Sequence, residues 1–103
     1  MSAALLSPQA RRDLADAAGW IARNNPQAAR ALRDTVARAA GLIGRFPKIG
    51  SERPDLADPP VRFHVLRGFP YVLVYDADGT PPRILRVLDG ARDLPELLRD
   101  FPP

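Results

Sequence analysis

Three short, largely apolar segments in the second half of the chain constrain its fold more than any other feature. They are residues 61–66, 71–76 and 83–88, separated by turns rich in Gly and Pro, and in the first of them Val61, Phe63 and Val65 alternate with Arg62, His64 and Leu66. Alternation with a period of two is the pattern of a strand with one buried face. The segments therefore predict an antiparallel meander of three strands.

The registers of the two predicted hairpins agree on one apolar face. Pairing Leu66 with Tyr71 aligns the first two strands, and pairing Asp76 with Arg83 aligns the second and third. A half-buried antiparallel sheet needs such a face. Only the helices in the first half of the chain can cover it, so we expect them to pack there. The face consists of Phe63, Val65, Val72, Val74, Leu85 and Val87.

The opposite face of the predicted sheet mixes apolar, aromatic and basic side chains. Such a surface is too apolar to be left bare and too polar to form a core, which indicates a binding site. Its three cross-strand rows are Arg62–Tyr75–Ile84, His64–Leu73–Arg86 and Leu66–Tyr71–Leu88.

Two helices are predicted before the sheet. Ser7 followed by Pro8 is a helix-capping pattern, and Asn25 followed by Pro26 repeats it. Apolar residues then follow at the spacing of one buried helical face, and their small size favours an antiparallel helical hairpin. The predicted buried residues are Leu14, Ala17, Ala18 and Ile21 in the first helix, and Ala29, Leu32, Val36, Ala39, Ala40 and Ile43 in the second.

Shorter features complete the predicted fold. Residues 3–6 form a short apolar strand, residues 47–60 form a long Pro-rich surface loop, and Asp93–Arg99 forms a short helix docked by leucines. We therefore expect one α+β domain over residues 1–103. A short N-terminal strand and an antiparallel helical hairpin pack on a three- to four-stranded antiparallel sheet, and a short C-terminal helix follows.

Composition narrows the possible chemistry. The 103 residues contain no cysteine and one histidine, His64, so a thiol nucleophile and a thiolate metal site are excluded and no cofactor is expected. No apolar run reaches the ~20 residues of a membrane span, so the expected location is the cytoplasm. Fourteen of the fifteen basic residues are arginine, which suits acidic or phosphate-bearing partners, although a GC-rich genome produces the same bias.

Several short motifs occur in order along nearly the whole chain. They are Leu6-Ser7-Pro8 with Arg12-Asp13-Leu14, Phe46-Pro47 with Gly50, Arg67-Gly68-Phe69-Pro70-Tyr71 with Val74-Tyr75, and Ile84-Leu85-Arg86-Val87-Leu88 with Gly90-Ala91-Arg92-Asp93-Leu94. In this order they resemble the ParE/RelE toxin superfamily, and the last motif is closer to the ParE branch. The resemblance implies the toxin of a type II toxin–antitoxin pair, held inactive in a hetero-oligomer by a cognate ParD-like antitoxin.

The resemblance also implies a target, which differs between the branches. ParE-type toxins inhibit DNA gyrase by binding, whereas RelE-type toxins cleave mRNA on the ribosome; an inactive relative that only binds antitoxin is a third alternative. One position departs from the family pattern. Asp89 stands where ParE-like chains often carry histidine, and near a catalytic histidine or tyrosine of many RelE-like nucleases.

The chemistry of RNA cleavage favours the binding toxin. Cleavage needs a base for the 2′-OH, donors for the charged transition state and an acid for the leaving oxygen. Arginines are plentiful, but His64 is the only side chain whose ordinary pKa lies near neutrality. The alternative of a nuclease would require a catalytic set of His64, Arg83, Arg86 and Tyr75.

Two sets of binding residues are predicted. The mixed sheet face and the neighbouring helices are expected to bind antitoxin through Arg62, Leu66, Tyr71, Leu73, Arg86 and Trp20. The C-terminal segment is expected to bind the target through Arg92, Leu97 and Arg99. Structural roles are the alternative: Trp20 packs at the edge of the core, Tyr71 covers the sheet, and Arg92 joins a local ion pair.

Overall fold

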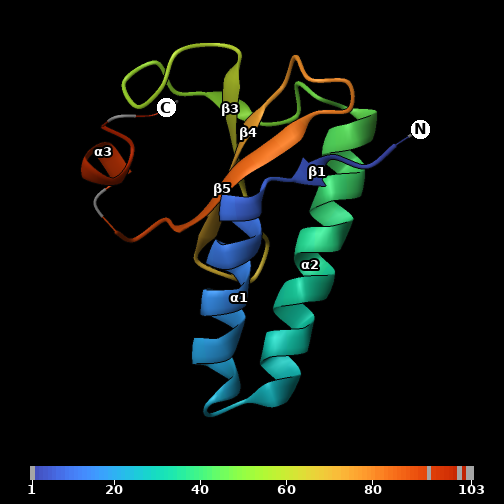
Figure 1. Ribbon diagram of the computed structural model, residues 1–103, viewed down its shortest axis with the longest axis vertical. Helices are drawn as coiled ribbons and strands as arrows, with labels where there is room; N and C mark the ends of the chain where they lie inside the picture. Colours follow the sequence, from blue (N-terminus) through green and yellow to red (C-terminus); the bar gives the residue numbers. More distant parts are fainter. Residues whose placement is uncertain (1, 93, 100, 102–103) are drawn as a thin grey trace.

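The chain folds into an α+β structure with one five-stranded sheet, as the computed structural model shows for residues 2–92, 94–99 and 101 (Figure 1). The helical hairpin and the strand meander confirm the predicted fold class. The strands lie in the order β1-β5-β4-β3-β2. The elements are β1 (Leu5–Leu6), α1 (Pro8–Ala22), α2 (Pro26–Arg45), β2 (Ser51–Glu52), β3 (Val61–Val65), β4 (Tyr71–Asp76), β5 (Arg83–Asp89) and α3 (Leu94–Leu97).

The sheet is mixed rather than purely antiparallel. β3, β4 and β5 form the predicted meander, but β1 runs parallel to β5, with Leu5 opposite Arg83 and Leu6 opposite Ile84. The two-residue strand β2 lies within the predicted loop of residues 47–60 and pairs antiparallel with β3. The two short strands extend the three-stranded meander at both edges.

The predicted register is confirmed for β3 and β4 but only partly for β4 and β5. Asp76 lies opposite Arg83 as predicted. An irregularity of the β-bulge type then shifts the pairing, so that Val74 lies opposite Arg86 instead of Leu85. Because strand side chains alternate between faces, a shift of one residue exchanges the faces of all the residues that follow.

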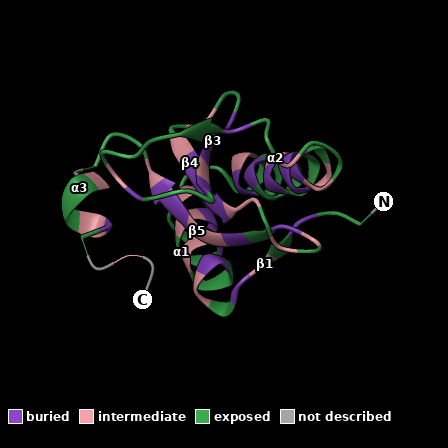
Figure 2. Cartoon of the chain, turned by 90° about the horizontal axis from the view of Figure 1, so that it is seen from above, coloured by how far each residue is buried: buried purple, intermediate pink, exposed green. Residues whose placement is uncertain are grey.

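The helices cover the opposite face of the sheet from the one predicted. Leu66, Leu73, Tyr75 and Ile84, which the sequence places on the open mixed face, are buried beneath α1 and α2. The other face is covered as well, because the segment around Leu98 packs on it; Figure 2 shows α3 and α2 on opposite sides of the strands. This second core contains Ala57, Val61, Phe63, Val72, Val74, Leu88 and Leu98.

The helices begin and pack largely as their sequence predicts. Ser7 and Asn25 are N-caps, and their side chains accept hydrogen bonds from the N–H groups of Ala10 and Ala28 at 3.0 and 3.1 Å. All six predicted core residues of α2 are buried. The predicted face of α1 is covered less completely: its buried members are Leu14 and Ala18, and its partly buried members are Ala17 and Ile21.

The C-terminal helix is shorter than predicted. α3 covers Leu94–Leu97, and the proposed capping residue Asp93 lies outside the described residues. Leu98, just beyond the helix, is 2% exposed and belongs to the second core. The leucines therefore dock the segment as expected, although the most buried one follows the helix. Among the described helices, none is both long and apolar enough to cross a membrane.

Candidate functional site

A buried tyrosine fixes the segment that follows α2. The Tyr75 hydroxyl donates a hydrogen bond to the Pro47 carbonyl at 2.6 Å and accepts one from the Gly50 N–H at 2.9 Å. Burial raises the pKa of Tyr75, an effect that the Gly50 N–H and the nearby charge of Arg62 only partly offset. The hydroxyl therefore stays protonated at neutral pH and ties this segment to the sheet.

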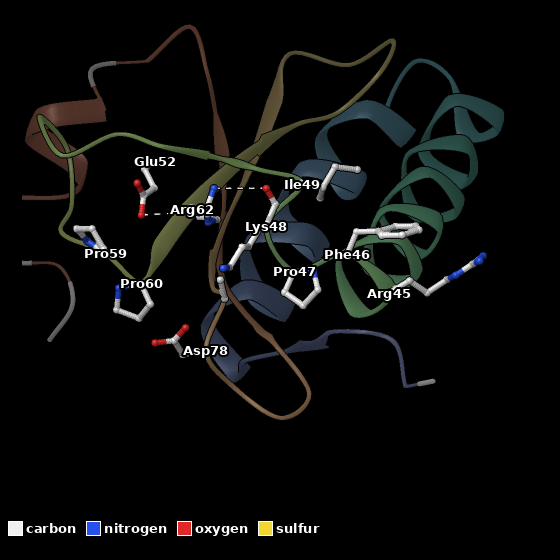
Figure 3. Close-up of a pocket in the computed structure, with 11 residues that line it drawn as sticks. Arg45, Phe46, Pro47, Lys48, Ile49, Glu52, Pro59, Pro60, Arg62 and Asp78 are labelled. Atoms are coloured by element: carbon white, nitrogen blue, oxygen red, sulfur yellow. Dashed lines mark hydrogen bonds and ion pairs between the residues drawn. The ribbon is translucent and has the colours of Figure 1, made fainter.

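Gly50 and Arg62 complete this connection. A Cβ atom at Gly50 would lie 2.7 Å from the Tyr75 hydroxyl oxygen and 2.8 Å from the Phe63 carbonyl oxygen, so a larger residue would force the two segments apart. Arg62 donates to the Gly50 carbonyl at 2.8 Å. It also lies 3.8 Å from the Glu52 carboxylate, a contact drawn in Figure 3. Arg62, which the sequence predicted to bind antitoxin, therefore makes these polar contacts with residues of its own chain.

The fixed segment presents large apolar side chains at the C-terminal end of α2. Phe46 and Ile49 are 53% and 44% exposed. Both line a cavity of about 950 Å³, and Figure 3 shows them beside the end of the helix. Leu42, one helical turn before Phe46, is also exposed. Three exposed apolar side chains within eight residues make a surface that a partner could cover.

A groove between α2 and β3 extends this apolar surface. Leu42 and Val65 line the groove, which has a volume of about 630 Å³, together with Arg38 and Arg67. Val65, predicted to lie on the covered sheet face, is 68% exposed because the core on that face ends before it. We define the α2–β3 surface as Leu42, Phe46, Ile49 and Val65.

A partly buried ion pair joins α1 to the bulged part of β5. Asp13 accepts hydrogen bonds from Arg86 Nε at 2.8 Å and Nη2 at 3.2 Å, from the Val87 N–H at 3.0 Å and from Gln9 at 3.0 Å. Burial opposes ionisation of Asp13, but these hydrogen bonds outweigh it and lower the pKa of the carboxyl group. The pair holds the first helix against the edge of the sheet.

The residues that the nuclease alternative would require do not form one site. His64 lines the groove against α2, where burial lowers its pKa. Arg86 leaves the row of His64 because of the bulge, and Asp13 holds its guanidinium. Arg83 shares a cavity with Arg86 but not with the histidine. The Tyr75 hydroxyl is committed to backbone groups.

The residues predicted to bind antitoxin are not gathered on one surface either. Leu66 and Leu73 are buried in the core, since the hairpin covers the face on which they lie. Tyr71 packs partly buried against the same core. Trp20 is 65% exposed, and the guanidinium of Arg23 lies 5.0 Å from the centre of its ring. The predicted open mixed face is therefore wrong, and of the predicted antitoxin-binding residues only Trp20 is well exposed.

The predicted target-binding residues lie near the C-terminal end of the described chain. Arg92 is exposed, and Leu97 lines a cavity of about 720 Å³ beside β5. Arg99 forms an exposed ion pair with Glu96 at 3.1 Å. Asp89, the residue that departs from the family pattern, accepts a hydrogen bond at 2.9 Å from the backbone N–H two residues later, which stabilises the turn after β5.

Sequence reasoning missed the α2–β3 surface and the ion pair of Asp13. The surface carried a signal, because Leu42 and Phe46 are spaced i, i+4 at the end of α2 but lie outside its predicted buried face. The alternation of residues along the chain carried no signal for the ion pair of Asp13 and Arg86. The bulge in β5 brings Arg86 to Asp13, and its position follows from the folded pairing.

Comparison with known proteins identifies the family of this α+β fold. A family model described as "ParE toxin of type II toxin-antitoxin system, parDE" matches residues 4–94. The chain therefore belongs to the ParE toxin family. Among solved structures it is similar to one described as "Chromosomal ParDE TA system from P. aeruginosa", with a TM-score of 0.69 and 20% identity over 84% of this chain and 94% of that chain. A comparison with curated proteins found no match.

Proposed function

We propose that this ParE-type toxin arrests growth by binding DNA gyrase and has no chemistry of its own. The observation that carries the proposal is the separation of the groups that RNA cleavage would need. His64 lies against α2, Arg86 is paired with Asp13, and the hydroxyl of Tyr75 is bonded to Pro47. Within the described residues, the four groups of the nuclease alternative (His64, Arg83, Arg86 and Tyr75) do not line one cavity. Inhibition by binding is consistent with this arrangement.

A cognate antitoxin is proposed to neutralise the toxin by covering the α2–β3 surface. Its apolar side chains are exposed, Arg38 and Arg67 stand beside it, and the guanidinium of Arg45 lies 5.5 Å from the centre of the Phe46 ring. Apolar residues surrounded by arginines suit an acidic, amphipathic segment. A stable complex would bury a total on the order of 1,600 Å².

The target is proposed to be contacted near Arg92. This side chain is exposed three residues after the end of β5 and five residues before Leu97 in the sequence. An exposed arginine contributes little to folding but is a frequent hot spot in interfaces.

The proposed absence of chemistry is tested by replacing the only histidine. His64→Gln keeps a polar side chain of similar size, and we expect growth inhibition in cells that lack antitoxin to persist. A catalytic acid or base contributes about 10²–10⁴-fold to a rate, so a nuclease that uses His64 would become harmless. Loss of toxicity in a variant with wild-type thermal stability would support the RelE-type alternative.

The antitoxin surface is tested by two matched substitutions of exposed leucines. Leu42→Asp lies within the α2–β3 surface, and Leu5→Asp lies on β1, away from it; the two residues are 41% and 56% exposed. We expect Leu42→Asp to weaken antitoxin binding by at least about tenfold, a loss of about 1.4 kcal/mol, and Leu5→Asp to leave it unchanged. Isothermal titration calorimetry measures both affinities. Equal affinities for the two variants would exclude the surface.

A further inference from the structure

The positive charge of this chain is concentrated in its helical half. Residues 8–49 contain eight arginines and lysines against three aspartates, whereas residues 50–103 contain seven basic residues against nine acidic ones. The net charge of +3 is modest because the acidic second half of the chain offsets a strongly basic first half. Such a separation of charge creates a local positive potential that attracts polyanions.

The outer side of α2 carries four of these eight basic residues. Arg30, Arg33, Arg38 and Arg45 are exposed on the helix, and Asp34 is its only acidic residue. In the part of the chain that the structure describes, none of these four arginines lies within 4.0 Å of a carboxylate. No carboxylate of the described chain neutralises their guanidinium groups, and two of them, Arg38 and Arg45, also flank the α2–β3 surface.

The residues between the arginines favour a phosphate backbone over a protein partner. Ala31 and Ala37 are exposed between them, and a side chain at Gly41 would meet no atom within 4 Å. Among the described residues, none therefore requires glycine at position 41, although glycine weakens a helix relative to alanine. Protein interfaces need large apolar or aromatic anchors, which the part of the helix around Arg30 and Arg33 lacks, whereas phosphate contacts need only cations and close approach.

We infer that the arginine face of α2, formed by Arg30, Arg33, Arg38 and Arg45, binds the phosphate backbone of duplex DNA. The four arginines extend over about 22 Å of helix axis, which corresponds to about six base pairs at ~3.4 Å each. The planar guanidinium fork of arginine bonds two phosphate oxygens at once. No aromatic residue lies between Arg30 and Arg45 to stack on unpaired bases, which favours duplex over single-stranded nucleic acid.

The inference goes beyond gyrase inhibition, because binding to free DNA requires neither gyrase nor antitoxin. It is tested by fluorescence anisotropy with the full chain and a labelled DNA duplex of about 20 base pairs and arbitrary sequence. Four phosphate contacts predict a slope of log K against log salt of about −3.6, a loss of about 150-fold between about 50 and 200 mM salt. Tighter binding to single-stranded RNA of the same length would overturn the inference.

A pair of variants that lose the same charge tests whether DNA binding depends on the arginine face or only on the net charge of the chain. Arg30→Gln combined with Arg33→Gln removes two charges from the face and spares the α2–β3 surface; the slope should fall to about −1.8, or about 12-fold over the same salt range. Arg53→Gln combined with Arg99→Gln removes two exposed charges that are already paired with acids and should leave the wild-type slope. Equal slopes for both variants would overturn the inference. So would a loss of antitoxin affinity without loss of DNA affinity in the first variant, since the face would then serve an acidic protein.

Discussion

Replacement of Asp13 by alanine should destabilise the fold strongly, because it leaves Arg86 partly buried without its ionic partner. The carboxylate accepts four hydrogen bonds, two from Arg86, one from Val87 and one from Gln9. The side chains of Asp13 and Arg86 are only 10% and 25% exposed. Breaking a buried ion pair costs about 3–5 kcal/mol. Because Arg86 keeps some contact with water, we expect Asp13→Ala to cost about 2–4 kcal/mol.

The contribution of Asp13 should also depend on pH in a defined direction. Its hydrogen bonds hold the pKa of the folded carboxyl group below the ordinary value of 3.8, against the opposing effect of burial. The stabilisation is therefore complete above that ordinary value and is lost as the pH falls through the lower pKa of the folded state. Asp13→Asn has no carboxyl group to titrate there, so its difference in stability from the wild type should shrink in the acid range.

Urea unfolding monitored by circular dichroism measures both effects, at neutral pH and at steps through the acid range. Asp16→Ala is the matched control, because Asp16 is an exposed aspartate on the same helix and no ion pair is found for it among the described residues. The control should change stability by no more than about 0.5 kcal/mol. A loss below about 1 kcal/mol for Asp13→Ala at neutral pH would refute a net stabilising role for the pair.

Two further substitutions test how the sheet is covered and how the antitoxin surface is held. Tyr75→Phe removes the hydroxyl that bonds Pro47 and Gly50. It should lower the free energy of unfolding by about 1–3 kcal/mol and weaken antitoxin binding in calorimetry. Unchanged values of both would show that these two hydrogen bonds do not hold the antitoxin surface in place. Leu98→Ala opens the second core at a residue that is 2% exposed; it should cost about 2–5 kcal/mol in thermal or urea unfolding, and a neutral result would mean that the C-terminal segment does not cover the sheet.

The helices and one hairpin could be predicted from the sequence because their signals are local. Ser7 and Asn25 cap the helices in the way their side chains allow, and the spacing of apolar residues over 29–43 identifies the buried face of α2. The register of β3 and β4 follows from the short turn that joins the two strands. Each of these features depends on residues that are close in sequence.

The orientation of the sheet could not be predicted because β4 is apolar on both faces. Val72, Leu73, Val74 and Tyr75 are all buried, so alternation alone does not distinguish the face beneath the hairpin from the other. The assumption that only the hairpin could cover the sheet failed, since the segment around Leu98 covers the second face. A strand buried on both sides has a continuous apolar run in place of alternation.

The candidate binding surface was missed for a related reason. Phe46 and Ile49 depend on a tie between Tyr75 and Pro47, residues 28 positions apart, and no local pattern predicts that bond. Once the sheet faces are exchanged, Leu66 and Leu73 move from the expected binding surface into the core. Val65 moves in the opposite direction, from the expected core to the surface.

The central claim, inhibition of gyrase by binding, is tested most directly with purified components. The full chain is added to DNA gyrase and relaxed plasmid, and supercoiling is followed beside a ribosome-dependent mRNA cleavage assay at the same toxin concentrations. We expect supercoiling to be inhibited and the mRNA to stay intact, and antitoxin added in excess should restore supercoiling. Cleaved mRNA with undisturbed supercoiling would contradict the account and identify a ribosome-dependent nuclease instead.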